Sequence, residues 1–222
     1  MVRPTALFLT VLTGLAGLFY EVAWQRFLAV LVGSDGEATA AVLALFLGGL
    51  AAGYALFARV TRRMVARARA RGTPPRLLLG YGLVEAGIGA WALAFPLLFA
   101  AAQRVSLFVP AGHAGLGFAF DVALCALLIV PPAALMGATI PMLTLALAGD
   151  VARSTRVHAW VYGCNTLGAF LGALVGAFWI LPALGLDAGV RAMGLLNLAV
   201  GAAFALLSLR AGGLAPRLDD AG

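Results

Sequence analysis

The chain has little of what a soluble protein needs to cover its surface. It contains no lysine, and only 11% of its 222 residues are charged, whereas 63% are hydrophobic and the mean hydropathy is +1.02. No stretch of ordinary polar composition is left over for a separate soluble domain. This composition argues against a soluble protein of one or two domains, the class that length alone would favour.

Cysteine and histidine are scarce as well. Cys125 and Cys164 fall inside apolar stretches and are expected toward opposite faces of a membrane, and neither has a second metal ligand at a suitable spacing. His113 and His158 stand at the expected ends of membrane segments, where they are read as interface residues. The motifs of nucleotide-binding, zinc and serine enzymes are missing. We therefore expect no disulfide, no metal site, no cofactor and no catalytic residue.

The net charge of +6 comes from fifteen arginines against nine acidic residues. Most arginines stand at the ends of apolar segments, where they set the orientation of a membrane protein and meet anionic lipid head groups. Neither stacking aromatic residues nor a separate basic domain accompanies them. The expected partner of this charge is the lipid bilayer and not nucleic acid.

Long hydrophobic runs fill the rest of the chain. About 20 apolar residues of helix cross a bilayer, and residues 5–209 divide into about six segments of at least that length. The sequence predicts an all-α polytopic membrane bundle over residues 1–210, whose first span is retained, followed by a short cytoplasmic tail at 211–222. The predicted helices are 5–31, 37–59, 76–103, 117–147, 156–182 and 187–209.

The distribution of arginine predicts the orientation. Twelve of the fifteen stand near the N-terminus, the connections 59–76 and 153–156, and the C-terminus, while Arg26, Arg104 and Arg191 stand near the other ends. Because positive residues stay on the cytoplasmic side, we expect both termini in the cytoplasm of a bacterium and the bundle in its inner membrane.

Two segments resemble each other. Residues 82–90 and 194–202 align with glycines at both ends, and Glu85 coincides with Asn197. Two three-helix units of opposite orientation, the plan of many transporters, would give this pattern. Chance similarity between helices rich in glycine, alanine and leucine is the alternative.

Small residues and prolines mark two further features. Glycines at four-residue spacing favour close helix packing; they are Gly49, Gly53, Gly168, Gly172 and Gly176. The segment 131–141 carries Pro131, Pro132 and Pro141 around Met136. Proline removes helix hydrogen bonds, so this segment predicts either a broken helix beside a binding site or a helix that is merely bent.

Ionisable residues inside apolar runs are the sharpest functional signal. A charge near the bilayer centre costs about 2.5–3.5 kcal/mol on insertion scales, so such residues usually face the bundle interior or water. The candidate ligand-binding residues are Glu21, Arg26, Glu85, Asp121, Tyr162, Asn165, Thr166 and Asn197. We expect Glu21 and Glu85 to share a polar cavity, closed on one side by residues 136–141, with Arg26 as counter-charge.

Four short motifs in order suggest a family. The motifs are residues 20–26 (YEVAWQR), 136–141 (MGATIP), 165–169 (NTLGA) and 181–186 (LPALGL). Together they resemble the membrane portion of bacterial spermidine synthase-like proteins, the fused major-facilitator/spermidine synthases. The resemblance implies a six-helix, half-transporter-like bundle, usually joined to a cytoplasmic aminopropyltransferase-like domain. The motifs of that domain do not occur, and Thr61 replaces an acidic residue usual in the connection after the second helix.

Two functions follow from this resemblance and from the buried acids. The first is a non-catalytic membrane module that anchors a separately encoded aminopropyltransferase-like enzyme, or binds or conducts a small cationic amine. The second is a stand-alone small transporter or channel that acts as a homodimer of six-helix halves, with the glycine face at 168–176 as its interface. An intramembrane enzyme would need a nucleophile paired with a base, which the sequence does not suggest.

Overall fold

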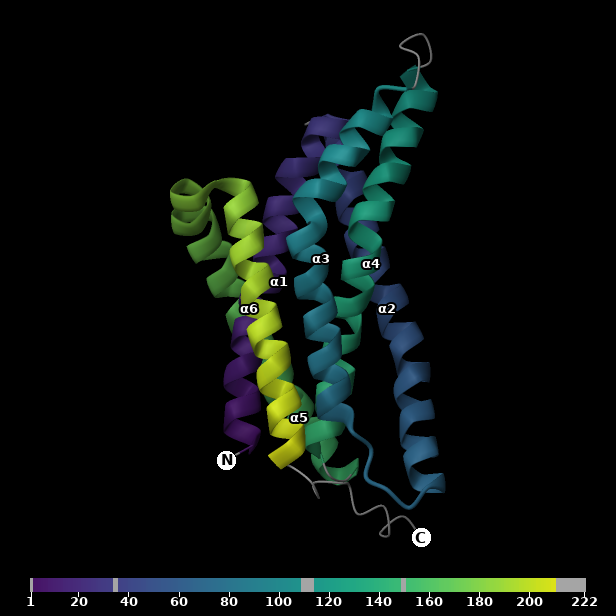
Figure 1. Ribbon diagram of the computed structural model, residues 1–222, viewed down its shortest axis with the longest axis vertical. Coiled ribbons are helices and arrows are strands. Elements are labelled where there is room, and N and C mark those ends of the chain that lie inside the picture. Colours follow the sequence, from purple (N-terminus) through teal and green to yellow (C-terminus); the bar gives the residue numbers. More distant parts are fainter. Residues whose placement is uncertain (1, 34–35, 109–113, 149–150, 211–222) are drawn as a thin grey trace.

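The computed structural model describes residues 2–33, 36–108, 114–148 and 151–210, and helices make up nearly all of these ranges (Figure 1). No strand occurs in them. The elements are α1 (Val2–Val32), α2 (Gly36–Ala70), α3 (Leu77–Ser106), α4 (Ala114–Ala148), α5 (Val151–Val175), the π-helix η1 (Gly176–Ile180) and α6 (Leu181–Arg210). The expected tail at 211–222 lies outside the described residues.

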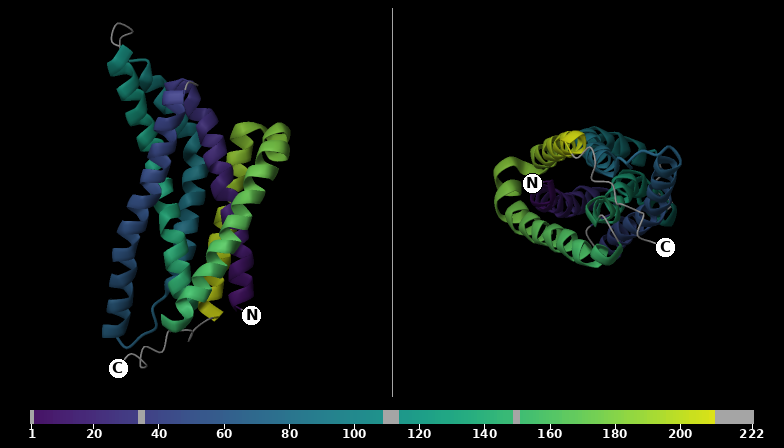
Figure 2. Two further views of the ribbon diagram at one scale, coloured as in Figure 1. Left: turned by 180° about the vertical axis from the view of Figure 1, so that it is seen from behind. Right: turned by 90° about the horizontal axis from the view of Figure 1, so that it is seen from below.

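Five helical stretches in the described ranges are long and apolar enough to cross a membrane. The all-helical class predicted from composition is therefore confirmed. The fifth stretch, Ser154–Arg210, contains α5, η1 and α6. Gly185 interrupts it with a φ of 76°, a left-handed conformation that glycine adopts readily. The chain rises along α5 and returns along α6 (Figure 2, left).

The second helix is longer than predicted. Residues 62–76 were expected to form a basic loop, but α2 continues to Ala70. Alanine and arginine are strong helix formers, and neither glycine nor proline occurs between Tyr54 and Arg71 to stop the helix. Gly72 ends the turn that follows, with a φ of 62°.

The two ends of the bundle differ in charge. The starts of α1, α3 and α5 and the ends of α2, α4 and α6 lie at one end, here called the arginine-rich end (Figure 1). The ends of α1 and α3 and the start of α6 lie toward the other, here called the Gly33 end because Gly33 follows α1. Most arginines of the described residues belong to the first end.

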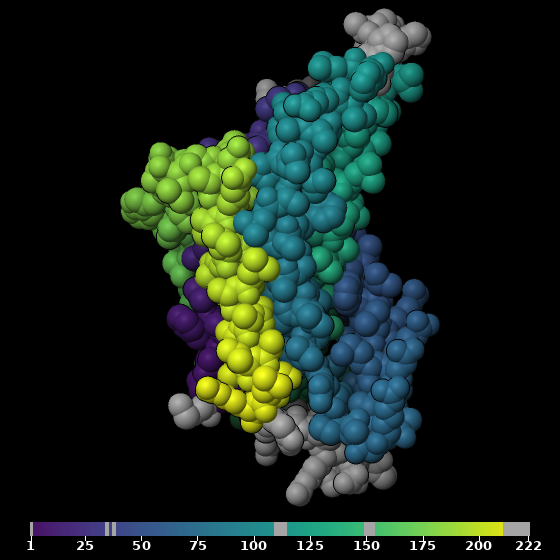
Figure 3. Space-filling view, in the orientation of Figure 1, coloured from purple at the N-terminus to yellow at the C-terminus, as the bar shows by residue number. Residues whose placement is uncertain are grey.

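Glycines bring α3 and α6 into backbone contact, one of the three most extensive helix contacts in the bundle. A side chain added at Gly82 would collide with the carbonyl oxygen of Gly201, and one at Gly201 with that of Gly82. Gly89 and Gly194 block each other in the same reciprocal way. The space-filling view shows α6 lying along α3 (Figure 3).

The other two extensive contacts join α1 to α5 and α2 to α4. Gly168 lies against the Val11 carbonyl and Gly172 against the Leu15 carbonyl, while Gly176 lies against the Phe19 ring. The glycine face expected to join two copies of the chain therefore packs within one chain.

The α2–α4 contact uses the same device. Gly49 approaches the backbone of Val130, and Gly53 that of Ala134. A side chain at either glycine would push the two helices apart. All five glycines singled out in the sequence thus lie at contacts between helices.

The proline segment does not break its helix. α4 runs from Ala114 to Ala148 with all three prolines inside it, so of the two alternatives the structure has a continuous helix and not a broken one. Pro132 cannot donate to the Leu128 carbonyl, four residues earlier. The Trp91 indole on α3 donates to that carbonyl instead, at 3.0 Å. A neighbouring helix thus satisfies a backbone group that the proline leaves free.

Candidate ligand-binding site

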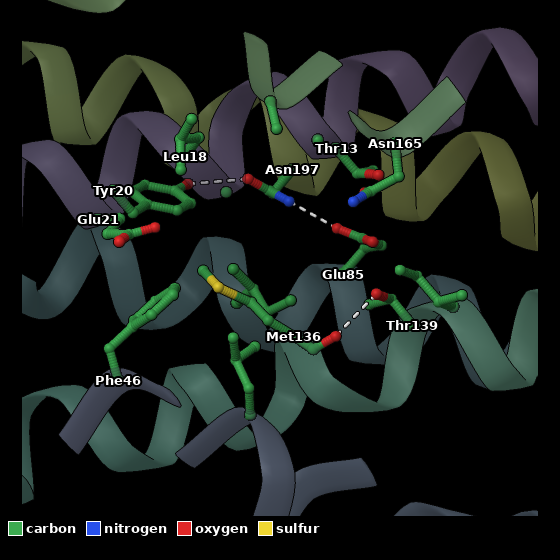
Figure 4. A pocket seen from close by; sticks show the side chains of 16 residues that line it. Thr13, Leu18, Tyr20, Glu21, Phe46, Glu85, Met136, Thr139, Asn165 and Asn197 are labelled. Atoms are coloured by element: carbon green, nitrogen blue, oxygen red, sulfur yellow. Dashed lines mark hydrogen bonds between the residues drawn. The ribbon is translucent and has the colours of Figure 1, made fainter. Parts of the chain in front are cut away.

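A cavity of about 220 Å³ lies in the middle of the bundle, and all six α-helices contribute to its wall. Its polar side chains are those of Thr13, Tyr20, Glu21, Glu85, Thr139, Asn165 and Asn197. The two asparagines are the only ones in the chain. Apolar side chains, among them Phe46 and Met136, complete the wall (Figure 4).

Glu85 on α3 is the most deeply buried acid of this wall, with 1% of its surface exposed. Its Oε2 accepts a hydrogen bond of 2.6 Å from the Asn197 side-chain amide on α6. Its Oε1 is buried and has no hydrogen-bond partner among the described residues. One oxygen of the buried carboxyl group thus lacks a well-aligned hydrogen bond among the described residues, although the Tyr81 hydroxyl lies close to the carboxyl group.

Asn197 links Glu85 to α1. Its Oδ1 accepts a hydrogen bond of 2.8 Å from the Tyr20 hydroxyl, while its Nδ2 donates to Glu85. The Glu85 carboxylate fixes which way the amide points, since a flipped amide would set its oxygen against a carboxylate oxygen. The Glu85 carboxyl group is thus held by contacts between three helices.

Tyr81 and Thr13 lie on the arginine-rich side of Glu85. Tyr81 is one helical turn from Glu85 on α3, and its hydroxyl is 3.3 Å from that of Thr13. Thr13 also donates to the Thr10 carbonyl at 3.1 Å. Of these two residues only Thr13 lines the cavity, and its hydroxyl is already engaged in hydrogen bonds within the protein.

Glu21 lies on the other side of the cavity, one residue after Tyr20. Its side chain is half-buried, and Figure 4 shows it pointing toward the space between Tyr20 and Phe46. The structure thus places Glu21 and Glu85 in the wall of one cavity, as expected, with Met136 and Thr139 of α4 on a third side. That these residues bind a ligand stays a prediction.

Arg26 was expected to neutralise these acids, but it is exposed and lies outside the cavity wall. It follows Glu21 by five residues, which is off the three- or four-residue spacing that brings two side chains together on a helix. Asp121 also lies elsewhere: it accepts a 2.6 Å hydrogen bond from Ser106 and so ties the end of α3 to the start of α4.

Two of the three candidates on α5 lie outside the cavity wall. Asn165 lines it, but Thr166 is exposed, because one residue further is turned by about 100° around a helix. Tyr162 is 56% exposed, and its ring stacks on His158 with 6.3 Å between centroids. Pro131, Pro132 and Pro141 also lie outside the wall, whereas Met136 belongs to it.

The sequence did not single out Tyr20, Thr13 or Thr139 as site residues. A hydroxyl in an apolar helix usually bonds back to its own backbone, as Thr139 does to the Met136 carbonyl at 2.8 Å. Tyr20 stands beside Glu21 in the motif of residues 20–26, and this position was the only sequence feature that could have indicated Tyr20 as a site residue. In the described residues, no group of three or more His, Cys, Asp or Glu side chains lies close enough to hold a metal ion.

Comparison with known proteins does not identify a relative of this chain. No family model, curated protein or solved structure matches the chain.

Proposed function

We propose that this chain is a six-crossing membrane protein whose central cavity binds a small cationic amine through Glu85 and Glu21. The observation that carries the proposal is Glu85, which lines the cavity and whose buried Oε1 has no well-aligned hydrogen bond among the described residues. A carboxylate in an apolar interior must be protonated, paired or hydrated. An ammonium group in the cavity pairs with it directly.

The size and the charges of the cavity suit a short diamine. Pockets for drug-sized ligands occupy about 300–1,000 Å³, so the 220 Å³ here fits a smaller molecule. A chain with one ammonium group at each end places one charge at Glu85 and the other at Glu21. The apolar side chains of Phe46 and Met136 would contact the methylene groups between them.

A twofold relation between residues 2–106 and 114–210 supports a transport-type architecture. In the alignment of residues 82–90 with 194–202, Gly82 corresponds to Gly194 and Gly89 to Gly201. Exchanging α3 with α6 therefore converts the Gly82–Gly201 contact into the Gly89–Gly194 contact. An interface that maps onto itself in this way is the mark of a twofold axis. The hydrogen bond between Glu85 and Asn197 lies at the middle of this contact.

The remaining helices follow the same relation. Val11 contacts Gly168 and Leu15 contacts Gly172; in the same way, Val130 contacts Gly49 and Ala134 contacts Gly53. Each of these residues in the first half is separated from its counterpart in the second half by the same number of positions along the chain. Exchange of α1 with α4 and of α2 with α5 thus maps one contact onto the other. We infer two inverted three-helix units with the cavity between them, as in many secondary transporters.

We further infer that the arginine-rich end faces the cytoplasm of a bacterium and that the bundle lies in the inner membrane, since positive residues are retained on the cytoplasmic side. The resemblance to spermidine synthase-like membrane portions points to a polyamine or its precursor as the amine. It also suggests a separately encoded aminopropyltransferase-like partner. A stand-alone transporter is the second candidate, and the inverted relation of the helices favours it.

Equilibrium binding of 1,4-diaminobutane to the purified protein in lipid nanodiscs tests the proposal. We expect saturable binding that Glu85→Gln weakens by at least about 10-fold, since the loss of one charge-assisted hydrogen bond costs about 1.5–3 kcal/mol. Glu21→Gln should weaken it as well. Asp121→Asn is the matched control, because Asp121 is a membrane acid outside the cavity wall, and it should bind as the wild type does.

Two outcomes would contradict the proposal. One is the absence of saturable binding by a folded, monodisperse wild-type protein. The other is equal binding by wild type and Glu85→Gln, which would make Glu85 a structural residue.

A further inference from the structure

Two smaller cavities continue from the central one along α1 and α2 toward the Gly33 end. The first is bounded by Glu21, Trp24, Gln25, Val42, Phe46 and Ile129, and it has no room for a water molecule. The second has about 60 Å³ and is bounded by residues including Gln25, Ala29, Gly33 and Val42. Glu21 and Phe46 belong to both the central and the first cavity, and Gln25 and Val42 to both smaller ones. The three spaces therefore form one row.

In the described residues, a buried cluster lies on the opposite side of the central cavity. Toward the arginine-rich end, Tyr81, Met142, Leu143, Val161 and Phe204 belong to one hydrophobic cluster, and each is at most 2% exposed. Leu143 occupies on α4 the place that corresponds to Trp24 on α1 under the twofold relation inferred above. Among the described residues, the two sides of the cavity thus differ, with a narrow row of spaces on one and a cluster of buried side chains on the other.

The first of the two smaller cavities, which has no room for water, is here called the constriction. Trp24 is its largest side chain and is 1% exposed. Its ring stacks on Tyr20 at 5.2 Å and on Phe95 at 5.4 Å between centroids, which holds it in the closed position. Its indole N–H, however, is buried without an acceptor among the described residues. An unsatisfied buried donor is unfavourable. A rotation of the ring that brings the N–H to water would relieve this cost, and that relief would partly compensate for the loss of the stacking contacts.

The constriction is also connected to the binding site. The Tyr20 ring stacks on Trp24, and the Tyr20 hydroxyl donates to Asn197, which holds Glu85. Glu21, three residues before Trp24 on the same helix, stands where the constriction meets the central cavity. A cation leaving the constriction therefore meets a carboxylate first.

We propose that small cations reach the central cavity from the Gly33 end, between α1 and α2, and that Trp24 is the gate of this route. The proposal deepens the proposed function, because it assigns a route to the site of that function. Phe46 and Ile129 form the remainder of the constriction.

The test measures how fast a hydrophilic thiol reagent reaches the central cavity. Gly17 lines that cavity, and a Cβ added there meets no atom within 4 Å, so Gly17→Cys places a thiol in the cavity without steric conflict. The background carries Cys125→Ala and Cys164→Ser. The protein is held in nanodiscs, so that both ends are accessible, and modification by a methanethiosulfonate carrying an ammonium group is followed by mass spectrometry.

Relative to this background, we expect Trp24→Ala to increase the rate of modification about 10- to 1,000-fold, because a minor open state populated at about 0.1–10% would become the main one. Trp24→Phe should stay slow, since a ring still fills the constriction. Phe46→Ala provides a second opening on α2 should Trp24→Ala fail to fold. Leu143→Ala is the matched control, because it removes an equally buried side chain on the packed side.

Two results would overturn the proposal. If Leu143→Ala accelerates modification as much as Trp24→Ala does, the effect is a general loosening of the bundle. If neither Trp24→Ala nor Phe46→Ala accelerates it in monodisperse protein, the route does not pass between α1 and α2. The thiol reaction needs no bound amine, so this test and the binding test fail independently of each other.

Discussion

Asn197 combines two roles that few side chains can fill together. It accepts from the Tyr20 hydroxyl and donates to the Glu85 carboxyl group, and it is 2% exposed. Because an amide carries both a donor and an acceptor, it joins α1 to α3 from a position on α6. A residue with only one of the two functions would leave a buried polar group without a partner.

Asn197→Leu should therefore destabilise the protein. The substitution leaves both the Tyr20 hydroxyl and Glu85 Oε2 without this partner, and an unsatisfied buried group costs about 1–3 kcal/mol. We expect a loss of this size in the free energy of unfolding, measured by steric trapping or by denaturation in mixed micelles. Asn165→Leu, a change of the other asparagine at the half-buried edge of the cavity, should cost less. Equal losses for both variants would contradict the role given to Asn197.

At the scale of the helices, α3 and α4 are joined by a hydrogen bond from a side chain to a backbone carbonyl that a proline leaves free. The Trp91 indole donates to the Leu128 carbonyl, which Pro132 leaves without its helical donor. Trp91→Phe keeps the aromatic ring but removes the donor. The cost should be about 1–3 kcal/mol, the range for a polar group left unsatisfied.

A double-mutant cycle checks this interpretation. Pro132→Ala restores an N–H that reaches the Leu128 carbonyl, so Trp91→Phe should cost clearly less in the Pro132→Ala background than in the wild type. The measurement is the free energy of unfolding of all four proteins. Additive costs would mean that the indole stabilises α4 by packing alone.

The approximate positions and lengths of the apolar helices could be predicted from the sequence, because a bilayer core about 30 Å thick sets the length of an apolar helix. The end of α2 did not, since arginine at residues 62–71 signals a membrane surface but does not stop a helix. Whether the helix breaks or bends at 131–141 could not be decided from the sequence for a related reason. A donor from another helix, Trp91, satisfies the freed carbonyl, and no local pattern in α4 announces it.

The site was predictable only in part. Glu21, Glu85 and Asn197 could be selected because polar groups are costly in apolar helices. Their partners could not, since the Tyr20–Asn197 hydrogen bond joins residues 177 positions apart. Arg26 shows the limit of spacing rules: residues five apart on α1 point to different surroundings, and only the packing of the other helices decides which side faces the cavity.

At the scale of the whole molecule, the inferred inverted units require an even number of crossings. A reporter fused after Arg210 should then report the cytoplasm, and one inserted after Phe108 should report the opposite side. Alkaline phosphatase and green fluorescent protein fusions distinguish the two compartments. An N-terminal and a C-terminal reporter on opposite sides of the membrane would mean an odd number of crossings and would exclude two inverted three-helix units.

The central claim is that Glu85 and Glu21 hold a small cation inside the bundle. A structure determined with 1,4-diaminobutane at saturating concentration tests it most directly. We predict density in the central cavity with one ammonium nitrogen about 2.7–3.2 Å from Glu85 Oε1, the range of a hydrogen bond, and the other directed toward Glu21. A well-resolved cavity without amine density, or amine bound only elsewhere on the protein, would contradict the account.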